Sequence, residues 1–214
     1  MAVQTGATTR RDGLVFVWDI GSKLLLVTVF VVFAIAHFSK WRSTGEPTGL
    51  GLVMQEGLVA TLFLLRRPPR RSSRAVVDWL LAVTGSFIIL AVRPTGSPLF
   101  GLRNVYLVIQ MIGLVGVVAS LGVLGRSFGI VAADRGLKTG GPYAIVRHPT
   151  YLSYLITQSG YLLQNPSVWN LALVVVTMVC QVGRIRAEER VLGQDEAWQQ
   201  YASRVRFRLI PGVF

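Results

Sequence analysis

The sequence predicts an all-α integral membrane protein with five to six transmembrane segments, a C-terminal helix-turn-helix hairpin and a cytoplasmic helical tail. Of its 214 residues, 52% are hydrophobic and only 15% are charged, and the mean hydropathy is +0.53. An ordinary soluble domain has about 25% charged residues. Apolar runs close to the roughly 20 residues that cross a bilayer recur along the chain. The formal net charge is +12, and the basic residues cluster between those runs, as is typical of membrane proteins.

The first half of the chain is expected to hold four apolar segments, at about residues 24–38, 50–65, 76–92 and 105–124. We expect residues 1–13, which are small and polar, to form a short flexible or interfacial arm. On the fourth segment, Gly113, Gly116 and Ser120 recur at spacings of three and four residues, which favours close packing against another helix. Residues 1–120 are therefore predicted to be the N-terminal transmembrane helices.

Residues 121–214 are predicted to form a hairpin and a tail that complete a single structural domain. The apolar runs 151–163 and 168–182 are separated by a polar turn, and the first run is short for a full crossing. We therefore expect a hairpin whose first arm is broken or tilted. The early part of the tail is expected to continue as a helix beyond the membrane.

The distribution of positive charge predicts the orientation. Eighteen of the 22 Lys and Arg residues fall before the first apolar segment, in the loop 66–74, in the connection 125–150 and in the tail, and the alternate loops hold only four. Because cytoplasmic loops are enriched in Lys and Arg, both termini are predicted to be cytoplasmic. The basic loops are also expected to contact anionic lipids.

Several other classes of site are disfavoured. No basic and aromatic surface stripe appears outside the segment ends, so nucleic-acid binding is not expected. His37 and His148 are the only histidines and there is no Cys-x-x-Cys, so a metal site is not expected either. The carboxylate of Glu56 falls within an apolar segment, where it is costly unless it faces protein or water. A functional role for Glu56 and a simple position near a tilted helix end both remain open.

Polar residues gather in the stretch 140–151. Two glycines and a proline break the chain there, and Pro149 holds His148 out of the helical region just before a helix begins. Arg147 and His148 can bind a carboxylate or a phosphate, and two tyrosines offer aromatic faces to a base or a cation. A basic turn beside lipid headgroups is the simpler interpretation.

A second polar group, Arg184, Glu188 and Glu189, follows the last apolar run. Arg184 and Glu188 are one helical turn apart, so a plain surface ion pair would explain them. The glutamates can also hold an ammonium, a ribose or a sulfonium. Both polar groups flank the same predicted hairpin, which favours a shared site.

Together these residues resemble the isoprenylcysteine carboxyl methyltransferase family, the wider group of integral membrane methyltransferases that includes phospholipid methyltransferases. The resemblance rests on Gly-Pro-Tyr-x-x-Val-Arg-His-Pro-x-Tyr, on Arg-Ile-x-x-Glu-Glu-x-x-Leu, and on Tyr201 followed by Arg-Leu-Ile-Pro-Gly. It covers roughly residues 121–212. The first half of the chain matches only in consisting of transmembrane helices.

The resemblance implies a cytoplasm-facing pocket for S-adenosylmethionine, built by the hairpin and tail, with a lipophilic substrate entering from the bilayer. The implied cofactor-binding residues are Leu137, Gly141, Tyr143, Arg147, His148, Pro149, Tyr151, Glu188 and Glu189. The implied catalytic residues are Arg184, Glu188 and Glu189. Arg184 would lie near the transferred methyl group, and a glutamate would take the proton if the acceptor is an amine.

Two other functions remain open from the sequence. Sterol reductases resemble this C-terminal architecture too, so an NADPH-dependent membrane sterol or lipid reductase is one alternative. A non-catalytic membrane protein that binds anionic lipid through its basic loops is the other. The sequence does not decide whether a methyl acceptor would be a carboxylate, an amine or a thiol, and it does not indicate the oligomeric state.

Overall fold

The computed structural model describes residues 5–45, 47–94 and 97–212, and helices make up most of it. The helices are α1 (Thr5–Thr44), α2 (Pro47–Leu65), α3 (Val76–Phe87), α4 (Arg103–Leu124), α5 (Pro149–Gln164), α6 (Val168–Leu192) and α7 (Glu196–Arg204). Four short 3-10 turns are η1 (Ile88–Ala91), η2 (Leu99–Gly101), η3 (Gly125–Ser127) and η4 (Gly141–Ala144). Two short strands, β1 (Arg71–Ser72) and β2 (Ala133–Asp134), pair antiparallel.

Within the described residues, four helices are long and apolar enough to cross a membrane. These spans are Gly21–Thr44, Thr48–Leu65, Arg103–Ser127 and Val168–Leu192. The apolar segment Val76–Ala91 is shorter, and α5 has only 16 residues. The predicted all-α membrane fold is confirmed, and the first arm of the hairpin formed by α5 and α6 is indeed short.

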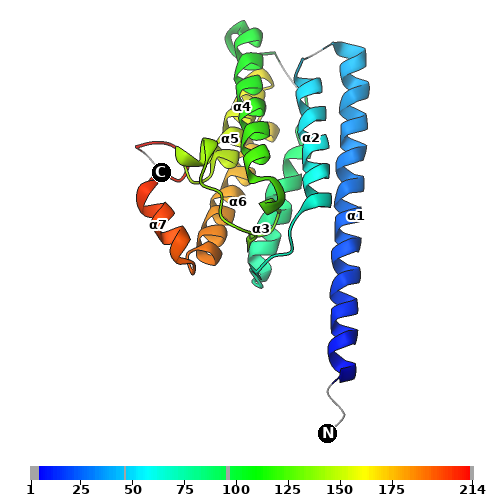
Figure 1. Ribbon diagram of the computed structural model, residues 1–214. Coiled ribbons are helices and arrows are strands. Elements are labelled where there is room, and N and C mark those ends of the chain that lie inside the picture. Colours follow the sequence, from blue (N-terminus) through cyan, green and yellow to red (C-terminus); the bar gives the residue numbers. More distant parts are fainter. Residues whose placement is uncertain (1–4, 46, 95–96, 213–214) are drawn as a thin grey trace.

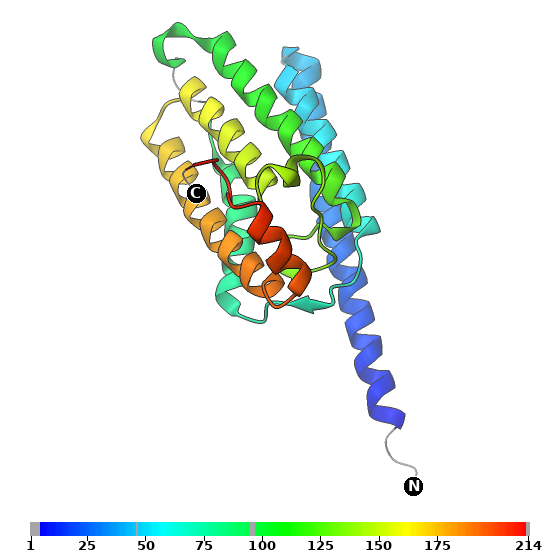
Figure 2. The same ribbon diagram turned by 60° about the vertical axis from the view of Figure 1, so that its left-hand side comes forward.

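The start of α1 differs from the sequence-based expectation. The helix begins at Thr5, so residues 5–13 are helical and a flexible arm is wrong for them, while an interfacial arm stays a prediction. Residues 1–4 lie outside the described residues. The N-terminal part of α1 extends beyond the rest of the bundle in both views (Figure 1, Figure 2).

The backbones of α4 and α5 approach closely at glycines. A Cβ atom built on Gly113 would lie 2.2 Å from Thr157 Oγ1 and 2.6 Å from Thr157 N, and one built on Gly116 would lie 2.5 Å from Ser153 Oγ. A side chain at Gly113 would therefore displace the backbone of α5, and one at Gly116 would displace the side chain of Ser153. The small-residue spacing on the fourth segment thus forms the helix contact that the sequence indicated.

The core joins α2 to α4. A cluster of Val59, Leu62, Phe63, Val117 and Leu121 is buried there. The ring of Phe63 meets that of Phe128, just after η3, edge to face at 5.2 Å between centroids. This contact anchors the chain that leaves α4, and it fixes where the long connection toward α5 begins.

The helix connections alternate between the two ends of the bundle (Figure 1). At the end where α1 joins α2, Asn170 is fully buried at the start of α6. Its Oδ1 accepts from Arg93 N at 2.9 Å, and its Nδ2 donates to Arg93 O and Asn165 O, both at 2.8 Å. One amide side chain thus ties α6 to the segment after α3 and to the end of α5.

At the opposite end, β1 and β2 join the basic loop to the connection that precedes α5. Arg71 pairs with Asp134 and Ser72 with Ala133. Arg70 N also donates to Asp134 O at 2.8 Å. This short pairing holds the basic loop beside the residues that lead into the polar stretch 140–151.

Gly113→Ala is expected to lower the free energy of unfolding by about 1–3 kcal/mol, because the added methyl group would overlap Thr157. Gly122→Ala is the matched control on the same helix, since a Cβ there meets nothing within 4 Å. That change should leave stability unaltered or raise it by up to about 1 kcal/mol, because alanine favours helix. Thermal unfolding of both variants in one detergent measures the difference, and equal stabilities would contradict the close contact.

Candidate active site

The turn before α5 lies against the tail that follows α7. Pro149 occupies the first turn of α5, and His148 precedes it with φ −128° and ψ 60°, outside the helical region, as the sequence predicted. Arg147 N donates to Phe207 O and His148 N donates to Arg208 O, each at 2.9 Å. The two segments that carry the sequence motifs are therefore joined through their backbones.

Glu189, near the end of α6, joins both segments to the helix. Its Oε1 lies 3.1 Å from Arg147 Nη1 and 3.3 Å from His148 Nε2, and its Oε2 accepts from Arg208 Nε at 2.8 Å. The side chain is only 14% exposed. A carboxylate buried to this extent needs such partners, since removing them would leave an uncompensated charge. Glu189 therefore holds the turn and the tail in place.

The guanidinium of Arg147 is occupied mainly by the tail. Nε donates to Val205 O at 2.7 Å, and Nη2 donates to Ala202 O at 3.0 Å and Arg206 O at 3.1 Å. Together with the contact from Nη1 to Glu189, these bonds engage every nitrogen of the group. The structure thus places Arg147 where it positions the tail.

His148 lies between the two glutamates and is buried. Its Nδ1 is 3.6 Å from Glu188 Oε2, while Nε2 faces Glu189. The ring centroid is 5.8 Å from that of Tyr151 and 6.3 Å from that of Trp198. Burial lowers the pKa of the imidazole, but hydrogen bonds to Glu188 and Glu189 outweigh this effect and raise the pKa of His148 above its ordinary 6.5. The arrangement favours a charged imidazole.

Arg184 and Glu188 lie one turn apart on α6, and both contact Tyr151. Tyr151 donates its hydroxyl proton to Glu188 Oε1, and the guanidinium carbon of Arg184 is 5.2 Å from the centre of the Tyr151 ring. No ion pair joins Arg184 to Glu188 among the ion pairs of the described residues. The plain surface pair that the sequence left open is therefore not what the structure shows.

One edge of Arg184 is held by the protein. Nη1 donates to Ser86 Oγ at 3.2 Å and Nη2 donates to Ile130 O at 3.0 Å. The buried Nε has no hydrogen-bond partner in the described part of the chain. A buried N–H left unpaired is costly, so the protein spends stability on the placement of this guanidinium.

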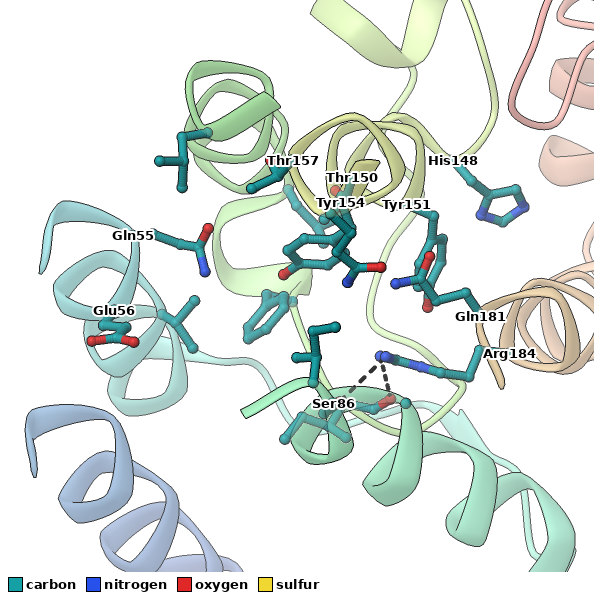
Figure 3. Close-up of a pocket in the computed structure, with 18 of the residues that line it drawn as sticks. Gln55, Glu56, Ser86, His148, Thr150, Tyr151, Tyr154, Thr157, Gln181 and Arg184 are labelled. Carbon is teal, nitrogen blue, oxygen red and sulfur yellow. Dashed lines mark hydrogen bonds between the residues drawn. The ribbon is translucent and has the colours of Figure 1, made fainter. Parts of the chain in front are cut away.

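These residues border a cavity of about 500 Å³ that extends between the helices (Figure 3). Figure 3 shows Gln181 and Arg184 on α6, Tyr151 and Tyr154 on α5, and Ser86 around it. The predicted site residues that line it are Leu137, Tyr143, Arg147, His148, Tyr151, Arg184 and Glu188.

The other three predicted residues lie beside the cavity without lining it. Gly141 begins η4 with φ 58°, a left-handed conformation that favours glycine. Pro149 begins α5, and Glu189 makes its contacts with the turn and the tail. Their positions suit residues that shape the site.

Two residues near the site carried no prediction. Ser86 on α3 holds Arg184, and nothing in the sequence around it indicated this role.

Trp198 packs on His148 from α7 and on Tyr201, whose centroid is 5.4 Å away. Tyr201 donates to Tyr143 O at 2.7 Å, and burial raises the pKa of Tyr201 to about 12, so the hydroxyl keeps its proton. The three-residue spacing of Trp198 and Tyr201 on a short helix was the available signal.

Comparisons with known proteins bear on the fold and the family of this chain. A sequence model of the phospholipid methyltransferase family matches residues 98–195. A search of curated proteins found no match. Among solved structures, the chain is similar to the eukaryotic intramembrane Ras methyltransferase ICMT (isoprenylcysteine carboxyl methyltransferase), with 17% identity and a TM-score of 0.50. The alignment covers 96% of this chain and 86% of that one.

At this level of identity, the structural likeness shows a shared fold. The family match covers the whole hairpin and both polar groups beside it, and it ends before Tyr201. The resemblance to the isoprenylcysteine carboxyl methyltransferase group that the motifs indicated is therefore confirmed. The family match supports a methyltransferase, and the apolar helices and the shared fold support an integral membrane protein.

The charged state of His148 predicts a pH dependence of stability. Because its pKa in the folded protein is raised above 6.5, its contribution is full below that value and is lost as the pH rises through the folded-state pKa. The difference in the free energy of unfolding between the wild type and His148→Gln should therefore shrink as the pH rises through this range. Denaturant unfolding at a series of pH values measures it.

A difference between wild type and His148→Gln that stays constant or grows as the pH rises would contradict a charged imidazole between the two glutamates.

Proposed function

We propose that the protein transfers the methyl group of S-adenosylmethionine to a lipophilic acceptor at the membrane. The observation that carries this proposal is the pair of Arg184 and Glu188 beside Tyr151, at the border of a cavity that continues between apolar helices. This arrangement combines a cation, a carboxylate and an aromatic face. The methyltransferase family match and the shared fold also support the proposed methyl transfer.

The residues present fit the chemistry of the cofactor. S-adenosylmethionine combines a carboxylate, an ammonium, a ribose and an adenine with a sulfonium that supplies an activated methyl group. Leu137, Tyr143 and Tyr151 offer apolar and aromatic surface to a base, and Glu188 offers a carboxylate to a cation or to ribose hydroxyls. We propose that these residues and His148 hold the cofactor.

The remaining predicted cofactor residues are proposed to act by positioning. Arg147 and Glu189 fasten the tail to α6 and to the turn. Gly141 and Pro149 set the path of the chain into α5. Through these contacts the four residues would keep the aromatic and charged side chains of the site in place.

Arg184 is proposed to bind and orient the acceptor. If the acceptor is a carboxylate, no base is needed, and the guanidinium can hold its oxygens for an in-line attack in a site that excludes water. If the acceptor is an amine, a proton must leave it, and Glu188 is the better placed of the two predicted bases. Glu189 is already bound by Arg147, His148 and Arg208.

The proposed acceptor is a prenylcysteine-like carboxylate or a lipid headgroup, which reaches the site through the apolar part of the cavity. We also propose that both termini face the cytoplasm, which the distribution of Lys and Arg supports. Basic loops at that end of the bundle, including the loop 66–74, would contact anionic lipid headgroups.

Titration of the purified protein with S-adenosylmethionine and, separately, with NADPH tests the proposed function. Calorimetry should detect binding of S-adenosylmethionine and none of NADPH. Binding of NADPH alone would favour a membrane reductase, and binding of neither would favour a non-catalytic lipid-binding protein. Transfer of a labelled methyl group to a prenylcysteine analogue and to phospholipid vesicles then distinguishes the two proposed acceptors.

Arg184→Lys is expected to separate cofactor binding from chemistry. Lysine keeps the charge but loses the planar fork that orients two oxygens. With a carboxylate acceptor, the affinity for S-adenosylmethionine should change little, while single-turnover methyl transfer slows by about ten- to a thousandfold, or about 1.4–4 kcal/mol.

Arg190→Lys is the matched control on the same helix, because Arg190 is 61% exposed and pairs with Asp78 away from the cavity. It should retain both properties. Wild-type turnover by Arg184→Lys would remove Arg184 from the proposed acceptor site.

A further inference from the structure

Glu56 is a buried carboxylate in the middle of an apolar helix that the proposed chemistry does not use. It lies near the centre of α2, within the candidate span Thr48–Leu65, and is only 5% exposed. Its Oε2 is 3.0 Å from His37 Nδ1 on α1. A position near a helix end therefore does not explain Glu56, and its burial requires a protein partner or a ligand.

The contact with His37 satisfies only part of the carboxylate. Oε1 of Glu56 makes no hydrogen bond within the described ranges, although a carboxylate can accept several. An ion pair that merely joined α1 to α2 would explain Oε2 but not the unpaired oxygen. In apolar surroundings an unpaired carboxylate oxygen is costly, so a further donor is expected at this position.

His37 and Glu56 line the same cavity as Arg184. Figure 3 shows Gln55 and Glu56 on α2 across the pocket from Gln181 and Arg184 on α6. The titratable groups that line this side of the cavity are His37, Lys40 and Glu56. The cavity wall is otherwise largely apolar, with Phe33, Leu52, Val59, Leu90 and Leu114 among its residues.

A cavity with polar groups on two opposite sides and apolar walls matches a long molecule that is polar at both ends. We propose that His37 and Glu56 form a second polar site that binds a hydrogen-bond-donating group, a hydroxyl or an ammonium, at the end of the acceptor remote from its methyl-accepting group. Glu56 Oε1 accepts from that group, and His37 holds the carboxylate in place. This inference rests on the proposed function and narrows its substrate class.

The test uses S-alkyl-N-acetylcysteines whose alkyl chains end in a methyl group, a hydroxyl or an ammonium. The methyl-accepting carboxylate is the same in all three series, and chain length is varied within each. For the wild type, kcat/KM for the best hydroxyl- or ammonium-ended compound should exceed that for the methyl-ended compound of equal length by about tenfold or more, the value of one charge-assisted hydrogen bond. The difference should appear mainly in KM.

Two variants locate this preference at Glu56. Glu56→Leu should abolish it, while kcat for the methyl-ended compound stays close to that of the wild type. Glu56→Gln keeps an accepting oxygen and the side-chain volume, so it should retain a preference for the hydroxyl and lose one for the ammonium. Glu196→Gln is the matched control, because Glu196 is an exposed carboxylate on α7, and it should behave as the wild type.

Binding of each compound is also measured directly, from the shift it causes in the thermal unfolding of the wild type and each variant. Absence of methyl transfer to every compound would count against the proposed function, and the binding shifts would still test the second polar site. Equal kcat/KM values for the three chain ends would overturn the inference and leave methyl transfer itself intact. Where no transfer occurs, equal binding shifts for the three chain ends would overturn the inference. A preference that persists in Glu56→Leu would likewise overturn it.

Discussion

The arrangement of the site depends on the ion pairs of Glu189. The turn before α5 and the tail after α7 are both basic in a chain of net charge +12, and they would repel each other without an anion between them. One carboxylate, 14% exposed, lies between Arg147 and His148 from the turn and Arg208 from the tail. The hydrogen bonds between the two backbones and the packing of α7 on His148 require that the two segments stay together.

The adjacent glutamates serve two different surfaces. Consecutive residues of an α-helix point about 100° apart, so α6 directs Glu189 toward the turn and tail, while Glu188 lies at the cavity beside Tyr151. His148 contacts both carboxylates, and it therefore connects the ion pairs of Glu189 to the carboxylate that faces the cavity.

The sequence predicted the positions of the helices better than the side-chain contacts between them. Apolar runs located the helices because the bilayer imposes a length and a composition, and Pro149 located the start of α5. The start of α1 was missed because the residues from Thr5 are polar and small. The residue types around 140–151 indicated a site, yet they did not reveal that backbone carbonyls of the tail occupy Arg147. The contacts of Ser86 with Arg184 and of His37 with Glu56 depend on how separate helices pack against each other, which no local sequence pattern encodes.

Asn170 at one end of α6 and Glu189 near the other connect both ends of that helix to other parts of the protein. Membrane helices commonly adjust to bilayers of different thickness by tilting. At its start, α6 is bonded to the end of α5 and to the segment after α3. Near its C-terminus, it is bonded to the turn and the tail, so it has little freedom to tilt independently of them. We therefore expect Arg184 and Glu188 to keep their positions relative to Tyr151 in thin and in thick bilayers. The geometry of the site would then not depend on bilayer thickness.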